Sequence, residues 1–385
     1  MQERQVLPVA VAGLLALLVA VIALWSLDRA GSAPVAAQSQ QQGLTDTIHW
    51  KLVTTWPKGL PGLGAAPENF ARRVNEASGG RLSIKVFGAG EIVPAFEVFD
   101  AVSRGVAEAG HGASYYWKGK IPAAVFYTAV PFGMSAQEAN AWLHYGGGLP
   151  LWRELYAPFG VVPFSGGSTG VQMAGWFNTR LQSREDLKGL KMRIPGLAGE
   201  VFDAAGGSAV RIAGGEIYTS MQTGVIDAVE WVGPYNDRTL GLMEVGQYYY
   251  YPGWHEPGAM LEIIVNADAL AALPEDLQAI VEVAARATNQ DMLDDFTAHN
   301  SESLEILLRD FDTEVLPLPD DVMDALYEQS QIAIKALIDS DPMAAKIADS
   351  YFDFAERVRT YHEISERAYL NARDRLLPPV TLTAE

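Results

Sequence analysis

The sequence predicts an α/β fold built in two parts, and three observations support this prediction. Strand-like and helix-like segments alternate in the first part of the chain, which is typical of a sheet with helical crossover connections. The chain has 385 residues, of which 49% are hydrophobic and 19% are charged. That length allows two domains with ordinary buried cores. From Pro274 onward the sequence turns strongly helical, so we expect long helices at the C-terminal end.

The alternation of strands and helices begins early in the chain. Ile48, Trp50 and Leu52 alternate with polar residues, which predicts a first strand. Two consecutive glycines, Gly79 and Gly80, are expected to end the helix that follows. The four elements expected here are a strand, a helix, a strand and a helix at residues 48–55, 67–78, 81–87 and 94–105.

The middle of the chain supplies further strands. The Gly- and Ser-rich residues 166–170 are expected to form a turn between two strands, at residues 161–164 and 171–177. A helix at residues 216–224 and a strand at residues 225–231 follow. The helical segments expected after them are residues 274–288, 290–309, 319–338 and 341–373.

The N-terminus predicts export from the cytoplasm. Residues 7–27 are apolar apart from Ser26. A secretory signal has an apolar core of about 7–15 residues, whereas a helix that spans a bilayer needs about 20. We expect residues 1–30 to be a signal peptide or a retained membrane anchor, and residues 31–45 to be a polar linker. The small residues Val35-Ala36-Ala37 have the spacing of a cleavage site. In both cases the body of the protein lies outside the cytoplasm.

Composition excludes several classes of function. The formal net charge of −19 disfavours binding to nucleic acid or to an anionic membrane, because both would be repelled. The absence of cysteine excludes disulfides, Cys-ligated metals and a lipoprotein anchor. The six histidines form no H-E-x-x-H motif, and no P-loop or G-x-G-x-x-G is present. A transition-metal site and a nucleotide-binding function are therefore disfavoured.

One segment matches the residue pattern of an enzyme motif. Residues 166–170 read GGSTG, which fits the G-x-S-x-G pattern of the α/β hydrolases and makes Ser168 a candidate nucleophile. That motif requires a helix directly after the serine. The residues that follow are glycine and strand formers instead. A hydrolase that uses Ser168 stays as the disfavoured alternative, and we expect no enzymatic activity.

An arginine is the most informative single residue of the sequence. The segment EDLKGLKMRIPG places Arg193 at the end of a strand-like run, two residues before Pro195. Proline fixes its own φ and favours an extended conformation in the residue before it. The planar guanidinium group of an arginine held in this way can grip a carboxylate through two parallel hydrogen bonds. Arg193 is therefore a candidate anion-binding residue.

Oxygen-bearing side chains in apolar surroundings form a second group of candidates. Glu230 lies in DAVEWVGP, Glu256 in WHEPG and Gln172 in VQMAGWF. An unpaired carboxylate is costly to bury, so each glutamate needs a cation, hydrogen bonds or water. They can reach water or pair with nearby basic residues such as Arg238. Together with the amide, they can also ligate a hard cation such as Na⁺ or Ca²⁺.

Several segments, in order and spacing, resemble the periplasmic solute-binding proteins of tripartite ATP-independent periplasmic (TRAP) transporters. The pieces EWVGPYND and PGWHEPG resemble the branch that binds 2-oxo or 2-hydroxy monocarboxylates with a metal ion. The matching segments read FARRVNEASGGRLSIKVFGAGEI, EDLKGLKMRIPG, GGEIYTSMQTGVIDAVEWVGPYND and YYYYPGWHEPGA.

The resemblance implies the fold and its division. It implies a two-lobed periplasmic binding protein with the ligand in the cleft between two α/β lobes, which are joined by crossing strands and a long helix. The lobes expected are residues 46–165 with 230–268, and residues 166–229 with 269–340. A C-terminal helix at residues 341–375 follows. Its amphipathic sequence allows it either to pack back on a lobe or to pair with a second subunit in a homodimer.

The resemblance also implies roles for individual residues. Arg193 would hold the carboxylate of the substrate. Gln172, Glu230 and Glu256 would ligate the metal through their side chains, and Trp231 through its backbone carbonyl. Tyr116 would contact the substrate, with Tyr115 as the alternative match, and Asn178 would add a further polar contact.

The function implied is capture rather than catalysis. The expected ligand is a small 2-oxo monocarboxylate such as pyruvate, bound together with Na⁺ or Ca²⁺ and passed to membrane-embedded permease subunits. The alternatives within the same family are a C4-dicarboxylate and a 2-hydroxy acid such as lactate. The implied location is the periplasm, where the protein is either free after signal cleavage or anchored to the inner membrane by residues 7–27.

Overall fold

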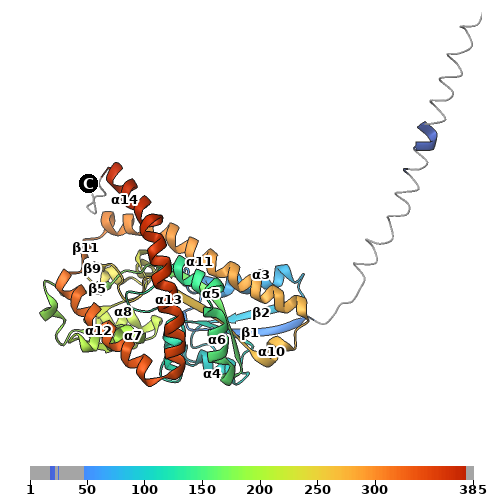
Figure 1. The fold of residues 1–385 in the computed structure, drawn as a ribbon, viewed down its shortest axis with the longest axis horizontal. Coiled ribbons are helices and arrows are strands. Elements are labelled where there is room, and N and C mark those ends of the chain that lie inside the picture. Colours follow the sequence, from blue (N-terminus) through green and yellow to red (C-terminus); the bar gives the residue numbers. More distant parts are fainter. Residues whose placement is uncertain (1–17, 22–24, 26–46, 379–385) are drawn as a thin grey trace, which may run out of the picture. The chain divides into compact units, whose positions relative to one another are not determined.

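The computed structural model describes residues 18–21, 25 and 47–378 (Figure 1). The expected signal or anchor at residues 7–27 and the linker at residues 31–45 therefore lie mostly or entirely outside the described residues. Among the residues that are described, no helix is both long and apolar enough to cross a membrane. The folded body is the compact unit that begins at Ile48.

A first mixed sheet of five strands forms one half of the body. Its order is β2-β1-β3-β10-β4, in which β1 lies parallel to both β2 and β3, and β10 lies antiparallel to both β3 and β4. The strands are β1 (Ile48–Thr54), β2 (Leu82–Phe87), β3 (Ala109–Gly112), β4 (Val161–Gly170) and β10 (Ala259–Asn266).

The first four predicted elements are confirmed. The strand expected at 48–55 is β1, and the next one is β2. The helix between them is α3 (Ala65–Ala77), which buries Phe70 and Val74. The second predicted helix divides into a 3₁₀ turn, η1 (Ala95–Glu97), and α4 (Val98–Ser103).

The turn predicted at residues 166–170 is wrong, because β4 runs unbroken through this segment. In β4, Ser168 pairs with Met260 of β10, and Gly167 pairs with Leu261. A Cβ atom at Gly166 would lie 2.5 Å from the backbone nitrogen of Ile263. Glycine is therefore needed for close approach of two strands, not for a turn. No helix follows Ser168 directly, because β4 continues to Gly170 and the next element is another strand, β5 (Gly175–Phe177). The strand–turn–helix geometry of a hydrolase nucleophile is therefore not present at Ser168.

A second mixed sheet of six strands forms the other half. Its order is β11-β9-β5-β8-β6-β7. Most of these strands are short, with three or four residues each. The strands are β5 (Gly175–Phe177), β6 (Lys191–Arg193), β7 (Ser208–Val210), β8 (Ala228–Val229), β9 (Tyr248–Tyr251) and β11 (Glu314–Pro317).

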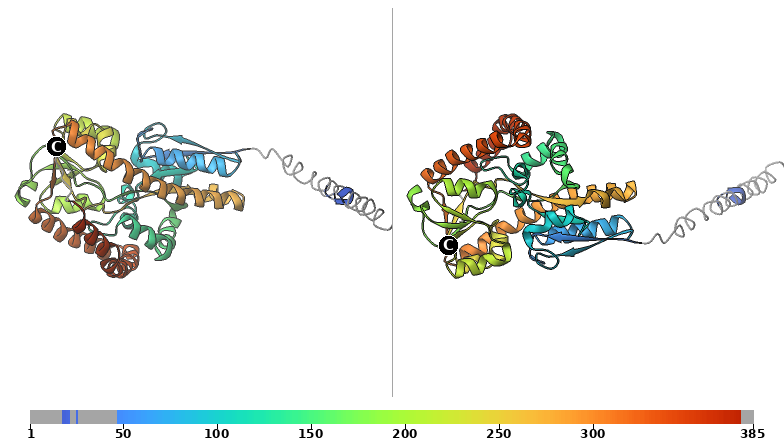
Figure 2. Two further views of the ribbon diagram at one scale, coloured as in Figure 1. Left: turned by 90° about the horizontal axis from the view of Figure 1, so that it is seen from above. Right: turned by 90° about the horizontal axis from the view of Figure 1, so that it is seen from below.

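Helices surround both sheets (Figure 2). Short 3₁₀ segments include η2 (Ser114–Trp117) and η3 (Pro122–Tyr127). The helices not yet given are α5 (Ala136–Tyr145), α6 (Gly148–Tyr156), α7 (Gly196–Ala204), α8 (Ile217–Gln222), α9 (Pro234–Thr239), α10 (Ala267–Ala271), α11 (Glu275–Asp310), α12 (Asp320–Ser340), α13 (Pro342–Ile364) and α14 (Glu366–Leu376).

Two strand connections and one helix join the halves. The chain passes from β4 in the first sheet to β5 in the second, and returns from β9 to β10. The two sheets divide the chain differently from the expected lobes at two places. Residues 166–170 were assigned to the second lobe but belong to β4 of the first sheet, and β9, within residues 230–268 of the expected first lobe, belongs to the second sheet. The reason for the second difference is that β9 pairs with β5 and β11.

Helix α11 is a single element, where two helices were expected. The predicted break at Asn289 does not occur. Asn289 is buried, and its side-chain amide donates to Oδ1 of Asn140 at 2.8 Å, so a tertiary contact satisfies the polar group within the helix. The α11 helix packs against β4, α3 and α9 and runs along the body as the long connecting helix (Figure 1).

The last predicted helix divides at Ser365 into α13 and α14. Ser365 has φ −118° and ψ −102°, which interrupts the helical hydrogen bonding. Helix α13 packs on α12, α5 and α6. Helix α14 has no buried residue, and it projects from the body at the end of α13 (Figure 1).

A buried carboxyl group links the first sheet to the aromatic segment η2. Glu262 of β10 accepts hydrogen bonds from the Trp117 indole and from the Tyr156 hydroxyl, the latter at 2.9 Å. The glutamate is fully buried. Desolvation raises its pKa from 4.5 to about 8, although both hydrogen bonds act in the opposite direction. Glu262 is therefore protonated in the folded protein at neutral pH.

This raised pKa predicts a pH-dependent loss of stability. Between pH 4.5 and about 8 the unfolded chain loses the proton of Glu262 while the folded protein keeps it. The free energy of unfolding should therefore fall by up to about 1.4 kcal/mol per pH unit across this window. Glu262→Gln, which keeps an acceptor for Trp117, should lose this part of the slope. Urea unfolding at pH 5 and pH 8 tests it, with the exposed Glu302→Gln as control. Parallel pH profiles for wild type and Glu262→Gln would contradict the expectation.

Candidate functional site

Pairing between two strands of the second sheet brings Arg193 beside Glu230. Strands β6 and β8 are parallel, and Arg193 lies opposite Val229. The backbone N–H of Glu230 donates to the carbonyl of Arg193 at 3.0 Å. The Ile194-Pro195 step then leads directly into α7. The sheet register therefore brings together two residues that lie 37 positions apart in sequence.

A second backbone contact brings Gln172 beside Glu256. The N–H of Gln172 donates to the carbonyl of Glu256 at 3.2 Å, and the N–H of Gly253 donates to the carbonyl of Gln172 at 2.8 Å. A Cβ atom at position 253 would lie 2.4 Å from that carbonyl oxygen. Glycine is thus required where the loop after β9 crosses the chain between β4 and β5.

The guanidinium group of Arg193 is buried and held on several sides. Its Nη1 donates to Oε2 of Glu230 at 2.8 Å and to the Glu230 carbonyl at 2.7 Å. Its Nη2 donates to the Tyr116 hydroxyl at 3.3 Å, and its Nε donates to the carbonyl of Ile212 at 3.2 Å. The centre of the Trp231 ring lies 5.0 Å from Cζ, within cation–π range. The arginine is therefore oriented in advance.

Two buried glutamates create an excess of negative charge. Glu230 and Glu256 have exposed fractions of 0% and 3%. Desolvation raises the pKa of Glu256 well above its usual value, and the charge of Glu230 raises it further. The Gln172 amide donates to Oε2 of Glu256 at 2.8 Å. One arginine thus faces two carboxyl groups, and a further cation would stabilise both as anions.

The oxygen atoms for such a cation are present. Within the described part of the chain, Oε1 of Gln172 and Oε1 of Glu230 are buried and have no hydrogen-bond partner. A buried oxygen without a partner costs free energy, because it has lost water and gained nothing in exchange. Carboxylate and amide oxygens are the ligands that Na⁺ and Ca²⁺ take. The residues present therefore fit a hard cation.

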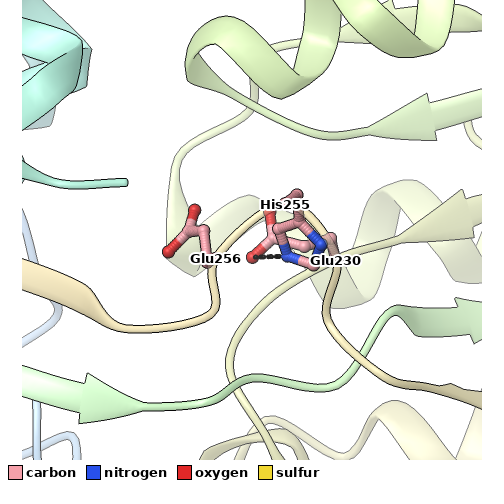
Figure 3. Close-up of side chains that lie close together, drawn as sticks. All are labelled: Glu230, His255 and Glu256. Atoms are coloured by element: carbon pink, nitrogen blue, oxygen red, sulfur yellow. Dashed lines mark ion pairs between the residues drawn. The ribbon is translucent and has the colours of Figure 1, made fainter. Parts of the chain in front are cut away.

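His255 joins this group, and it was missed in the sequence. Its Nε2 lies 3.6 Å from Oε1 of Glu230. Figure 3 marks this ion pair with a dashed line. One ligand atom from each of Glu230, His255 and Glu256 lies within 4.8 Å of the others. Metal-binding sequence motifs contain paired histidines, whereas His255 is a single one. Its position next to Glu256 was the available signal.

A small cavity lies between these side chains and the aromatic segment η2. Its volume is about 10 Å³, close to the room that one water molecule needs. Of the described residues that line it, only Arg193 is a lysine or an arginine. The lining residues are Trp56, Leu63, Tyr115, Tyr116, Thr169, Gln172, Arg193, Trp231, Val232, Glu256 and Leu261.

The structure brings all but one of the predicted site residues to this place. Five of them line the cavity: Arg193, Gln172, Tyr116, Trp231 and Glu256. Glu230 does not line it but forms an ion pair with Arg193. Tyr115, the alternative to Tyr116, lines the cavity as well and interacts with Glu256.

Asn178 is not brought to the cavity. Its side chain is exposed, and it lies at the opposite end of β5 from Gln172. Its backbone N–H donates to the carbonyl of Asp227 at 3.0 Å. The length of β5 therefore separates Asn178 from the other candidates, and its assignment to the site is corrected.

Two sheets joined by crossing strands, with a buried arginine and acidic oxygens near the crossings, define a two-lobed solute-binding protein. The chain belongs to the bacterial extracellular solute-binding proteins, family 7, which matches residues 52–341. Proteins of this family are periplasmic and act with membrane permease components to take up small carboxylates.

Relatives and solved structures agree with this family. The chain is 43% identical over 333 residues to a monocarboxylate 2-oxoacid-binding periplasmic protein of Nostoc sp., covering 86% of this chain and 91% of the relative. It also resembles a TRAP solute-binding protein of Pseudoalteromonas atlantica with bound sodium and pyruvate. That match has 41% identity, a TM-score of 0.82, and coverage of 84% of this chain and 99% of the other.

A third match adds a different ligand and an oligomer. It is a TRAP solute-binding protein of Bordetella bronchiseptica, 38% identical with a TM-score of 0.83, and the match covers 85% of this chain and 97% of that one. It is a mixed-occupancy dimer in which one site holds calcium and picolinate and the other is empty.

Proposed function

We propose that this protein captures a small 2-oxo monocarboxylate such as pyruvate, together with Na⁺ or Ca²⁺, for a TRAP permease. The observation that carries the proposal is a fully buried arginine beside two buried oxygens that have no partner in the described chain. An arginine binds the carboxylate of a solute, and the free oxygens bind a cation. The relatives named above, with bound pyruvate, sodium and calcium, support this choice of ligand.

Each residue of the site has a distinct role in this proposal. Arg193 holds the solute carboxylate, with the Tyr116 hydroxyl beside it. The metal is held by the side-chain oxygens of Gln172, Glu230 and Glu256 and by the backbone carbonyl of Trp231. A bound cation supplies the positive charge that lets an anionic solute lie among acidic residues. In this arrangement the solute lies beside the metal, so Gln172 and Trp231 contact the solute as well as the metal.

The described conformation leaves only a small cavity at this site, which would have to widen to admit the solute. A cavity of about 10 Å³ has no room for a solute with several non-hydrogen atoms. Proteins with two lobes open and close around a hinge. The crossings β4–β5 and β9–β10 are the segments that such a hinge would use. The proposed lobes are accordingly the two sheets with their helices, with β9 placed in the second lobe.

Removal of the metal should abolish solute binding. With Ca²⁺ or Na⁺ present, calorimetry is expected to show pyruvate binding with heat release. After treatment with EDTA in buffer free of sodium, the affinity should fall by about 100-fold or more, because the two carboxylates then repel the solute. Re-addition of the metal should restore binding. Unchanged affinity in the metal-free protein would refute the metal-bridged mode.

The same titration separates the alternatives. A C4-dicarboxylate needs a second cationic side chain, and Arg193 is the only lysine or arginine among the described residues that line the cavity. Succinate should therefore bind at least about 100-fold more weakly than pyruvate. Lactate keeps the carboxylate and replaces the oxo group by a hydroxyl, so its affinity decides between a 2-oxo and a 2-hydroxy acid.

In this proposal no bond is made or broken, so Ser168 does not act as a nucleophile. Ser168→Ala should therefore leave pyruvate binding unchanged.

The N-terminal segment determines whether the protein is free in the periplasm. We propose that residues 7–27 direct export, followed either by cleavage near Ala37 or by retention in the inner membrane. The mass of the mature protein and its distribution between periplasmic and membrane fractions distinguish the two outcomes. A full-length chain in the membrane fraction indicates an anchor.

We propose that α14 mediates formation of a homodimer. It has no buried residue, although it carries Tyr369, Leu370 and Leu376 with exposed fractions of 66%, 42% and 74%. Large exposed apolar side chains that cluster on one element mark interaction surfaces. The dimer of the Bordetella bronchiseptica protein supports a dimeric state. A chain that ends at residue 364 should be a monomer by light scattering, whereas the longer chain should be a dimer. A monomeric longer chain would overturn this proposal.

A further inference from the structure

We propose that His255 gives the metal site a nitrogen ligand, so that the site also binds a transition-metal dication such as Zn²⁺. This inference rests on the metal site of the proposed function. It extends the range of cations bound there from hard ones, such as Ca²⁺, to ones of borderline hardness, such as Zn²⁺. An imidazole favours zinc, copper or nickel, whereas carboxylate and carbonyl oxygens favour calcium and sodium.

The geometry places the imidazole within reach of a shared ion. Nε2 of His255 lies 3.6 Å from Oε1 of Glu230. In a tetrahedral zinc site, with bonds of about 2.0–2.2 Å, neighbouring ligand atoms lie about 3.4 Å apart. The ligand atoms of Glu230, His255 and Glu256 all lie within 4.8 Å of one another. Coordination of one ion would require the more distant of these ligand atoms to move closer together.

Apart from the ion pair that a protonated ring would form with Glu230, the imidazole has no polar partner in the described chain. Neither ring nitrogen of His255 has a hydrogen-bond partner in the part of the chain that the structure describes. The separation of 3.6 Å from Glu230 is too long for a hydrogen bond. The residue is buried, with an exposed fraction of 1%. A buried ring without hydrogen bonds has lost its contacts with water, and coordination of an ion would compensate for that loss.

The backbone holds His255 in this position. The neighbouring Trp254 packs its ring against Phe132 at 5.9 Å between ring centres, and the carbonyl of Trp254 accepts a hydrogen bond from the Phe132 N–H at 2.8 Å. The N–H of Glu256 donates to the carbonyl of Gly253 at 3.2 Å. The loop therefore orients the histidine and the glutamate from both sides.

Titration of the metal-free protein with Zn²⁺ alone tests the inference. Wild type should bind one Zn²⁺ at this site, and His255→Gln should weaken that binding by at least about tenfold, since even indirect partners of metal ligands contribute 10- to 100-fold. Affinity for Ca²⁺ should change less than threefold. His299 is the matched control, because its side chain is partly exposed and lies 2.8 Å from Asp295, where Zn²⁺ could bind adventitiously. His299→Gln should leave the buried site unchanged.

A second measurement needs no variant. Anomalous scattering at the zinc edge, from crystals of wild type grown with one equivalent of Zn²⁺, should place the ion within about 2.2 Å of a ring nitrogen of His255. An ion only at His299, or a Zn²⁺ affinity that is unchanged in His255→Gln, would overturn the inference. Pyruvate binding with Ca²⁺, measured on the same samples, tests the proposed function independently. If pyruvate fails to bind while zinc is held by His255, only the proposed solute is wrong.

Discussion

Replacement of Arg193 by methionine is expected to abolish pyruvate binding. Arg193→Met keeps much of the length and apolar volume of the side chain but removes the guanidinium group that would hold the solute carboxylate. Removal of one partner from a buried, hydrogen-bonded charge pair costs about 2–5 kcal/mol, or about 30- to several thousand-fold in affinity. Arg193→Lys should recover only part of this loss, because an ammonium group cannot form two parallel hydrogen bonds. Calorimetry with pyruvate and Ca²⁺ measures both variants.

The same substitution should also destabilise the fold. Arg193 and Glu230 are both buried and lie 2.8 Å apart, so Arg193→Met leaves the glutamate without its partner. A broken buried pair typically costs about 3–5 kcal/mol of stability. The double variant Arg193→Met with Glu230→Gln removes both charges, so it should regain most of the stability while pyruvate binding stays lost. Binding that returns with stability would show that Arg193 only supports the fold.

The second large effect is expected at Glu256. Glu256→Gln removes one of the two charged ligands of the cation, so the affinity for Ca²⁺ should fall by about 100-fold or more, and the affinity for pyruvate should fall with it. Added Ca²⁺ at high concentration should restore part of the pyruvate binding, which distinguishes a weakened metal site from a lost solute contact. Titrations of pyruvate at several Ca²⁺ concentrations measure this coupling.

Glu262→Gln is the matched control for Glu256→Gln. Both glutamates are buried, and desolvation raises the pKa of both. Glu262 contacts Trp117 and Tyr156 instead of the residues that line the cavity. Affinity for Ca²⁺ and pyruvate should therefore be close to that of wild type in Glu262→Gln. Equal losses in both variants would indicate general damage to the fold and would contradict the assigned role of Glu256.

Local sequence patterns predicted β1 and β2 of the first sheet and the helix between them, but they predicted neither β3 nor β10. The alternation of Ile48, Trp50 and Leu52 is that of β1, and the glycines after α3 mark its end. These signals are local, because the side-chain period and the left-handed conformation of glycine depend on neighbouring residues. The same reasoning failed at residues 166–170, where the glycines allow close contact with a strand more than 90 positions away in sequence.

The sequence by itself determined which residue types could form the site. It identified an arginine at the end of a strand-like run, two residues before a proline, and it identified carboxylates and an amide that are too costly to bury unpaired. Only the tertiary structure decided which of them meet. The register of β6 against β8 places Glu230 on Arg193, and the loop after β9 brings in His255. The length of β5 keeps Asn178 away. Contacts between residues distant in sequence depend on strand register and chain crossings, which a local pattern does not encode.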